Sequence, residues 1–118
     1  MKASGLSDIG KMRQNNEDNF FCDASRKLFI VADGLGGHSA GEVASEMAVK
    51  HISNGELKDV DDLVERITEA NVNVYSEAQN LKNDMATTIS SLFIYEGTAH
   101  IGHVGDSRIY LIREENIY

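Results

Sequence analysis

The apolar positions in the first third of the chain predict two neighbouring strands. Residues 19–22 form a short apolar run, and residues 27–32 form a longer one that is almost continuously apolar. A continuous run of this length is typical of a strand that is covered on both faces. The glycine-rich segment 33–37 follows directly, and we expect the second strand to end there because glycine weakens strand interiors.

Two helices are predicted after the glycine-rich segment. Ser39 and Glu42 have the spacing of a capping box at the start of the first helix, and Asn54-Gly55 is a typical stop signal at its end. The second helix is expected to begin between residues 59 and 62. The predicted inner faces consist of Val43, Ala44, Met47, Ala48, His51 and Ile52 in the first helix, and of Val60, Leu63, Val64, Ile67, Ala70, Val74, Ala78 and Leu81 in the second.

Strand patterns return in the last third of the chain. Residues 87–95 are rich in β-branched and aromatic side chains, and Glu96-Gly97 has the composition of a tight turn before residues 98–104. A further strand is predicted over residues 109–113, followed by a turn at 114–116. The sequence stops just after this turn, so we expect an unpaired sheet edge. The whole chain is predicted to be one α+β unit with no internal domain boundary.

Composition and charge narrow the functional classes. The 118 residues include 42% hydrophobic side chains, which is enough for one small domain with a buried core. The formal net charge of −8, from 19 acidic and 11 basic residues, argues against nucleic acid or an anionic membrane surface as a partner. The excess of acidic groups suits a protein that holds divalent cations, and it equally suits an ordinary solvated surface.

Features related to cellular location are also informative. No apolar run approaches the roughly eighteen residues of a membrane span, and residues 1–10 lack the basic and apolar regions of a secretory signal. Cys22 is the only cysteine, which rules out an internal disulfide and fits a reducing compartment. We therefore expect a cytoplasmic location.

Three polar clusters carry the candidate chemistry, and each lies beside a predicted strand. They are residues 13–19, residues 33–38 and residues 105–108. Carboxylates at strand ends can converge on one rim of a sheet, and these clusters offer oxygen ligands. Such ligands favour hard cations such as Mg²⁺ or Mn²⁺ over zinc, which prefers cysteine or several histidines.

Asp33 and Gly34 are the most informative pair in these clusters. A carboxylate at the tip of a rigid strand is well placed to bind a metal, and the glycine allows close approach, so that its carbonyl oxygen can be a further ligand. Arg13 supplies a planar guanidinium that matches phosphate oxygens. Metal ions beside an arginine indicate phosphoryl chemistry, in which two ions activate a bridging water and neutralise the transferred group.

Each of these residues, taken alone, also has an ordinary structural explanation. Glu17 and Asp18 suit a solvated loop, Asp33 can cap the following helix, and Arg13 can be a surface arginine. Asp106 is a good turn residue because its side chain can hydrogen-bond the nearby backbone. The interpretation as a site therefore rests on finding all three clusters, in order, in one chain.

The segment from Gly34 to Ser39 offers a competing interpretation, because a strand followed by such a glycine-rich turn resembles a dinucleotide-binding fingerprint. The match fails in detail, since Ser39 stands at the third glycine position. Asp33 would also bring a negative charge close to the pyrophosphate. We therefore reject dinucleotide binding.

Four motifs, in this order, resemble those of the bacterial protein phosphatase 2C family. The first is Ser7-Asp8-Ile9-Gly10 with Arg13, Asn16, Glu17 and Asp18, and the second is residues 31–38 followed by Gly41-Glu42. The third is Met85-Ala86-Thr87-Thr88, and the fourth is residues 103–111. The resemblance extends over almost the whole chain. The third motif departs from the family in one place, since Ala86 replaces the usual glycine.

The resemblance implies a fold. Family members are α-β-β-α sandwiches, in which antiparallel sheets are flanked by helices, and their catalytic domains are considerably longer than this chain. We therefore expect residues 1–118 to form a single incomplete domain, a partial sandwich flanked by two helices. It would lack the carboxy-terminal half of the family fold, including two later metal-binding aspartates.

The resemblance also implies a reaction, in which two or three Mn²⁺ or Mg²⁺ ions activate water to attack phosphoserine or phosphothreonine in phosphorylated protein substrates. Asp33 would bridge the two core metals, and the Gly34 carbonyl would bind one of them. Glu17 would act on the same ion directly or through water. Asp18 would support these ligands without being one of them.

Two further residues receive roles by the same resemblance: Arg13 would hold the substrate phosphate, and Asp106 would belong to a third, weaker metal site. The leading hypothesis is a serine/threonine phosphatase whose 118-residue chain is weakly active or inactive by itself, because metal ligands are missing. A second hypothesis is a non-catalytic half-domain that self-associates through its open sheet edge or binds phosphoproteins.

Overall fold

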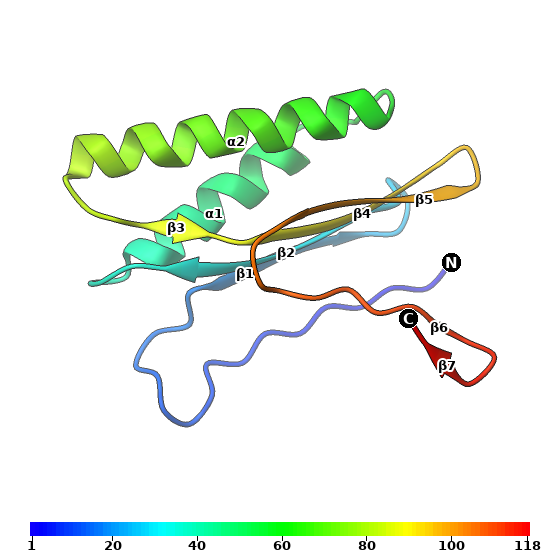
Figure 1. The fold of residues 1–118 in the computed structure, drawn as a ribbon, viewed down its shortest axis with the longest axis horizontal. Helices are drawn as coiled ribbons and strands as arrows, with labels where there is room; N and C mark the ends of the chain where they lie inside the picture. The colour runs from blue at the N-terminus through cyan, green and yellow to red at the C-terminus, as the bar shows by residue number, and fades with distance from the viewer.

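The computed structural model, which describes residues 1–118, is organised around an antiparallel sheet (Figure 1). The elements in chain order are β1 (Asp18–Asp23), β2 (Leu28–Leu35), α1 (Ala40–Ser53), α2 (Val60–Leu81), β3 (Ala86–Thr87), β4 (Ile89–Tyr95), β5 (Thr98–Val104), β6 (Ile112–Arg113) and β7 (Asn116–Ile117). β1, β2, β4 and β5 lie in that order across the sheet, β3 pairs with the end of β2, and β6 and β7 form a separate hairpin. The predicted α+β class, with two helices and antiparallel sheets, is confirmed.

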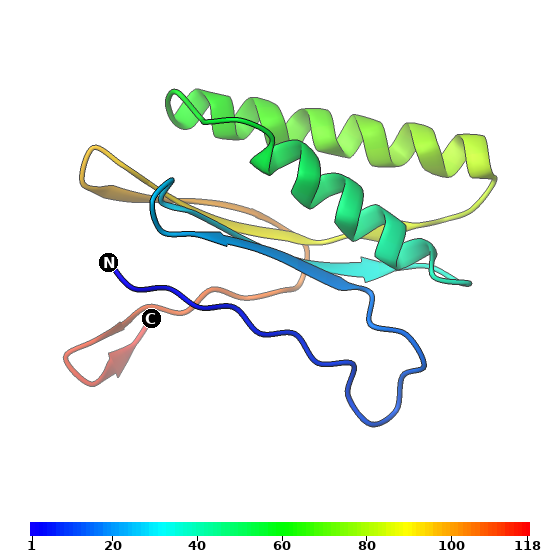
Figure 2. The ribbon, with the colours of Figure 1, turned by 180° about the vertical axis from the view of Figure 1, so that it is seen from behind.

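Both helices cover the same face of the main sheet (Figures 1 and 2). On β2, Leu28, Ile30 and Ala32 are buried on the helix side, while Val31, on the opposite face, is 47% exposed. This alternation follows from the two-residue period of a strand. The prediction that β2 is covered on both faces is therefore wrong, because only extended segments from near the two chain ends cross the second face (Figure 2).

β2 continues beyond the point where the sequence predicts its end. Gly34 and Leu35 pair with Thr87 and Ala86 of β3, so the ladder holds the glycine-rich segment in strand conformation through Leu35. The prediction that the strand ends at Asp33 is therefore wrong, since pairing with β3 offsets the weakness of glycine in a strand. The predicted strand 87–95 is present as β3 and β4, with a break at Thr88.

Helix α1 begins without the predicted capping box. Ser39 occupies the N-cap in the left-handed conformation, at φ 66°, and its side chain makes no capping hydrogen bond. Its hydroxyl instead accepts a hydrogen bond from Asn15 Nδ2 at 3.1 Å. The helix packs on the sheet mainly through small side chains, and its buried residues are Ala40, Gly41, Ala44, Ser45, Ala48, Val49 and Ile52. The predicted end at Asn54-Gly55 is confirmed, whereas Val43 is exposed.

Helix α2 begins after Asp59, whose carboxylate accepts a hydrogen bond from the Asp62 N–H at 2.9 Å. Much of its predicted inner face is confirmed, with Leu63, Ala70, Val74 and Ala78 buried. Val64 and Leu81 are exceptions, at 59% and 53% exposure. Val64 stands about 100° around the helix from Leu63, and Leu81 is the last helical residue. Neither α1 nor α2 combines the length and the hydrophobicity that crossing a membrane would require.

The β4–β5 hairpin matches its prediction. Glu96 and Gly97 have positive φ values of 50° and 76°, as the mirror-image turns of short hairpins require. The predicted strand over residues 109–113 is present only at Ile112–Arg113, which pairs with β7 and not with the main sheet. The expectation that this strand would be left unpaired at a sheet edge is therefore wrong, and β5 is an edge strand of the main sheet instead.

Candidate active site

Asp18 and Asp33 form the centre of the candidate site. The β1–β2 register places them directly opposite each other, so their side chains lie on the same face of the sheet, the one that neither helix covers. Partial burial, a hydrogen bond to the Asp33 carboxyl and the negative charge of that group together raise the pKa of the Asp18 carboxyl above its ordinary value. The site thus brings together two carboxyl groups that disfavour simultaneous ionisation in the absence of a cation.

Arg13 lies beside this pair. Its Nη1 atom is 3.9 Å from Asp33 Oδ1, and both side chains remain about half exposed. The positive charge of Arg13 partly opposes the upward shift in the pKa of Asp18. An ion pair this long and this exposed contributes little to folding stability. Its guanidinium therefore remains available to a ligand such as phosphate.

Glu17 lies next to Asp18 in the sequence, and its negative charge adds to the upward shift in the pKa of Asp18. Its Oε2 atom is buried without a hydrogen-bond partner. A β-carbon added to Gly41, in the first turn of α1, would lie only 1.9 Å from this oxygen. The Glu17 backbone carbonyl accepts hydrogen bonds from the Gly34 N–H at 3.1 Å and from Ser45 Oγ at 2.7 Å. Glu17 is therefore held between the end of β2 and the start of α1.

Gly34 is required by packing at this junction. A β-carbon at Gly34 would lie 1.9 Å from the Gly41 carbonyl oxygen and 2.7 Å from the Glu17 carbonyl oxygen. No side chain fits there, so the glycine allows α1 to approach the strand that carries Asp33. This packing role is independent of the metal-binding role that the sequence predicts for the Gly34 carbonyl.

In the third predicted cluster, residues 105–108, Ser107 lies at the site and Asp106 lies outside it. A hollow of about 260 Å³ on this face of the sheet is lined by Leu6, Ser7, Asp18, Asn19, Phe20, Val31, Ala32, Asp33 and Ser107. Asp106 is exposed and does not line it. Ser107 Oγ lies 2.8 Å from Thr88 Oγ1, which in turn accepts a hydrogen bond from the Asp33 N–H at 2.9 Å.

The residues of the hollow fit a hard divalent cation in chemical type. Two adjacent carboxyl groups, one with a raised pKa, lack the positive charge that such an ion would supply, and oxygen donors are what Mn²⁺ and Mg²⁺ prefer. No group of three or more aspartate, glutamate, histidine or cysteine side chains is arranged to hold a metal by itself. The residues present therefore fit as part of a ligand set, with water or further groups completing the coordination.

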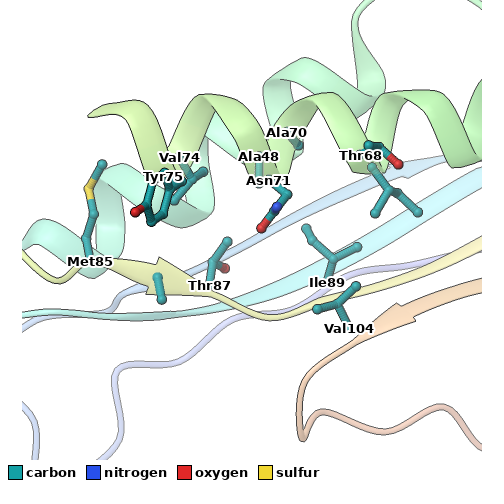
Figure 3. Close-up of a pocket in the computed structure, with 12 residues that line it drawn as sticks. Ala48, Thr68, Ala70, Asn71, Val74, Tyr75, Met85, Thr87, Ile89 and Val104 are labelled. Atoms are coloured by element: carbon teal, nitrogen blue, oxygen red, sulfur yellow. The ribbon is translucent and has the colours of Figure 1, made fainter. Parts of the chain in front are cut away.

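A larger hollow of about 380 Å³ lies on the other face of the sheet, between α2 and strands β3 to β5 (Figure 3). Its walls include Ile67, Val74, Met85, Ile89 and Val104, and no charged side chain lines it. It therefore offers no carboxylate for a metal ion and no positive charge for phosphate.

Several contributors to the site were not identified from the sequence. Gly41 and Ser45 hold Glu17, and Thr88 and Ser107 connect Asp33 with the turn after β5. Thr88 and Ser107 belong to motifs that the sequence analysis noted, but no pattern indicated their contact. Gly41 also belongs to one of these motifs. Ser45 belongs to none, and nothing in the sequence distinguishes it from other helix residues.

The chain is similar to known bacterial protein phosphatases. The chain matches the family model described as protein phosphatase 2C over residues 9–118. It is 37% identical to the protein phosphatase PhpP of Streptococcus pneumoniae, in a match covering 100% of this chain and 53% of that protein. It is 36% identical to the serine/threonine phosphatase stp of Listeria monocytogenes, covering 96% of this chain and 50% of that protein. The chain thus spans about half the length of the curated relatives it matches.

Solved structures show the same likeness. The catalytic domain of the serine/threonine protein phosphatase PstP, in complex with 2 manganese ions, matches with a TM-score of 0.86 at 30% identity, over 95% of this chain and 51% of that one. The phosphatase MsPP of Mycobacterium smegmatis, in complex with cacodylate, matches with a TM-score of 0.84 at 31% identity, over 95% of this chain and 49% of that one.

Proposed function

Because the chain belongs to the protein phosphatase 2C family, we propose that its protein hydrolyses phosphoserine and phosphothreonine in phosphorylated proteins, with Mn²⁺ or Mg²⁺ as cofactor. The observation that carries this proposal is the Asp18–Asp33 carboxyl pair with Arg13 Nη1 3.9 Å from Asp33 Oδ1. A carboxyl pair beside a half-exposed guanidinium suits a site that must hold both a cation and a phosphate. The two manganese ions of the PstP structure support the choice of cofactor.

Each residue of the site has a role in this proposal. Asp33 and the Gly34 carbonyl would hold the core cations, with Glu17 as a further ligand, directly or through water. Asp18 would accept hydrogen bonds from water in the hollow and orient Asp33 from across the ladder. The bound cations would supply a water of lowered pKa and neutralise negative charge on the phosphate.

Arg13 and Asp106 would act at the edge of this arrangement. The planar guanidinium of Arg13 would bind two phosphate oxygens of the substrate and orient the phosphorus toward the hollow. Asp106 would contribute to a third, weaker cation site, because it is an exposed carboxylate one residue before Ser107, which lines the hollow. No covalent link between the chain and the phosphate is part of the proposal.

The 118-residue chain by itself is proposed to be weakly active or inactive. Its carboxyl groups supply part of a ligand set, and it spans about half the length of its relatives. Fewer carboxylates mean less negative charge at the cation, so metal affinity should fall. A cytoplasmic location belongs to the same proposal, on the ground that a single cysteine fits a reducing compartment.

A second candidate function is a non-catalytic half-domain that pairs with another copy or binds phosphoproteins through Arg13. The observation that favours pairing is the free edge of β5, whose sequence from Thr98 to Val104 contains neither a charged residue nor proline. Such an edge has none of the usual features that prevent strand addition. The mass of the chain in solution distinguishes the candidates, since a stable dimer supports pairing and a folded monomer contradicts it.

The test of the leading proposal is phosphate release from a phosphothreonine peptide in the presence of Mn²⁺, by the wild-type chain and by Asp33→Asn. We expect a low rate that requires Mn²⁺ and disappears in the variant. A rate that is independent of Mn²⁺, or that Asp33→Asn leaves unchanged, would contradict the assigned site. Mn²⁺ binding without any hydrolysis would agree with an inactive chain, and the mass in solution would then decide between the two candidates.

A further inference from the structure

The ladder between β2 and the β3–β4 segment is modified at Asp33. Val31 pairs with Ser90 on one side of it and Gly34 pairs with Thr87 on the other, in the same register. Asp33 therefore faces Thr88. The Thr88 N–H donates to the Asp33 carbonyl at 2.9 Å, which is the first of the two hydrogen bonds expected of such a pair.

The second bond of the pair is replaced by side chains. The Asp33 N–H donates to the Thr88 hydroxyl, Oγ1, at 2.9 Å, and not to the Thr88 carbonyl. That carbonyl accepts a hydrogen bond from Thr87 Oγ1, also at 2.9 Å. Two consecutive threonine hydroxyls thus substitute for one ladder hydrogen bond at the residue that carries the central carboxylate of the site.

The Thr88 side chain also contacts the turn that follows β5. A hydroxyl can accept and donate at once, and Thr88 Oγ1 lies 2.8 Å from Ser107 Oγ while it accepts the Asp33 N–H. Its methyl group packs against Gly105, where an added β-carbon would lie 2.6 Å from Thr88 Cγ2. One side chain therefore contacts both the strand that carries Asp33 and the turn that carries Asp106.

We propose that Thr88 is a positioning residue, whose hydroxyl fixes the Asp33 backbone relative to the 105–107 turn and so sets the carboxylates for cation binding. This inference rests on the proposed function only in its last step, cation binding. The Asp33 backbone is otherwise held by the Thr88 N–H and, one residue later, by the hydrogen bond from the Gly34 N–H to the Glu17 carbonyl. Removing the hydroxyl frees one of these anchors and leaves the Asp33 N–H without its acceptor.

The test compares Thr88→Val, which removes the hydroxyl at nearly constant shape, with Thr88→Ser, which keeps it. Thr68→Val is the matched control, because Thr68 Oγ1 donates to the Val64 carbonyl at 2.9 Å on the exposed side of α2. Two quantities are measured for each variant and for the wild type. The first is the hydrogen-exchange rate of the Asp33 amide without metal, by NMR. The second is the midpoint of a Mn²⁺ titration, in which the electron paramagnetic resonance signal reports the free Mn²⁺.

We expect Thr88→Val to accelerate exchange at Asp33 and to weaken Mn²⁺ binding by about 10–100-fold, the usual effect of removing a partner that orients a metal ligand. Thr88→Ser should restore both quantities, and Thr68→Val should change neither. The inference would be overturned if the Asp33 amide of Thr88→Val exchanged as slowly as in the wild type, or if Thr88→Val bound Mn²⁺ with wild-type affinity. If Thr88→Val does not fold, the same two quantities are compared between Thr88→Ala and Thr88→Ser.

The two readouts separate this inference from the proposed function. A wild-type chain that does not bind Mn²⁺ would contradict the proposed site, while the exchange rates would still decide whether Thr88 fixes the Asp33 backbone. If the wild type and Thr88→Val bind Mn²⁺ with equal affinity, the proposed function stands and Thr88 is rejected as a positioning residue.

Discussion

The Asp18 carboxyl faces the Asp33 carboxyl directly across the β1–β2 ladder, on the sheet face that neither helix covers. Like charges opposite each other in a ladder are destabilising, and here partial burial, the hydrogen bond to Asp33 and the charge of Asp33 together raise the pKa of Asp18. A fold gains nothing in stability from this arrangement. It is what a cation site requires, and it implies a measurable cost when no cation is present.

Asp18→Asn is expected to raise the melting temperature of the metal-free chain at pH 7, because it removes the repulsion between Asp18 and Asp33. The folded-state pKa of Asp18 lies above the ordinary value of 3.8, so the wild-type penalty is present above the folded pKa and is relieved as the pH falls through it toward 3.8. Melting curves from pH 7 to pH 4 check this. A difference between variant and wild type that stays constant over this range would contradict it.

Gly41→Ala is expected to destabilise the fold by about 1–3 kcal/mol, the usual cost of overpacking. The new β-carbon would meet Glu17 Oε2 at 1.9 Å and the Leu35 backbone nitrogen at 2.6 Å. Gly37→Ala is the matched control, because nothing lies within 4 Å of its added β-carbon. Urea unfolding of both variants measures the effect, and equal midpoints for the two would show that Glu17 is not confined as described.

Arg13→Ala is expected to leave the free energy of unfolding within about 0.5 kcal/mol of wild type, because its ion pair with Asp33 is long and exposed. Binding of inorganic phosphate in the presence of Mn²⁺ should nevertheless weaken at least about tenfold, since a charged hydrogen-bonding fork is lost. Arg113→Ala, at the exposed β6–β7 hairpin, serves as the control. Equal phosphate affinity in the two variants would remove Arg13 from the site.

Much of the fold could be predicted from the sequence, because local patterns determine it. The strand run 27–32, the helix stop at Asn54-Gly55 and the Glu96-Gly97 turn each depend on nearby residues, and the structure contains all three features. The sequence also predicted that polar clusters near strand ends come together, and Arg13 and Asp33 do so.

Other features depend on contacts that no local pattern records. β2 extends to Leu35 only because β3 pairs with it, and Ser39 takes a left-handed conformation in place of a capping box. The directions of Glu17 and Asp18 were equally unpredictable. Neighbouring residues of an extended chain point to opposite faces, so a shift of one residue in the register would exchange them.

The most direct test of the central claim, that Asp33 lies at a divalent-cation site, is calorimetric titration of the chain with Mn²⁺. Asp23→Asn is the control for Asp33→Asn, since Asp23 lies at the opposite end of the β1–β2 ladder. The account predicts weak, saturable binding to wild type and to Asp23→Asn, and its loss in Asp33→Asn. Binding that Asp33→Asn leaves unchanged would contradict the site, and tight binding of two ions would contradict the view that these residues supply only part of the ligand set.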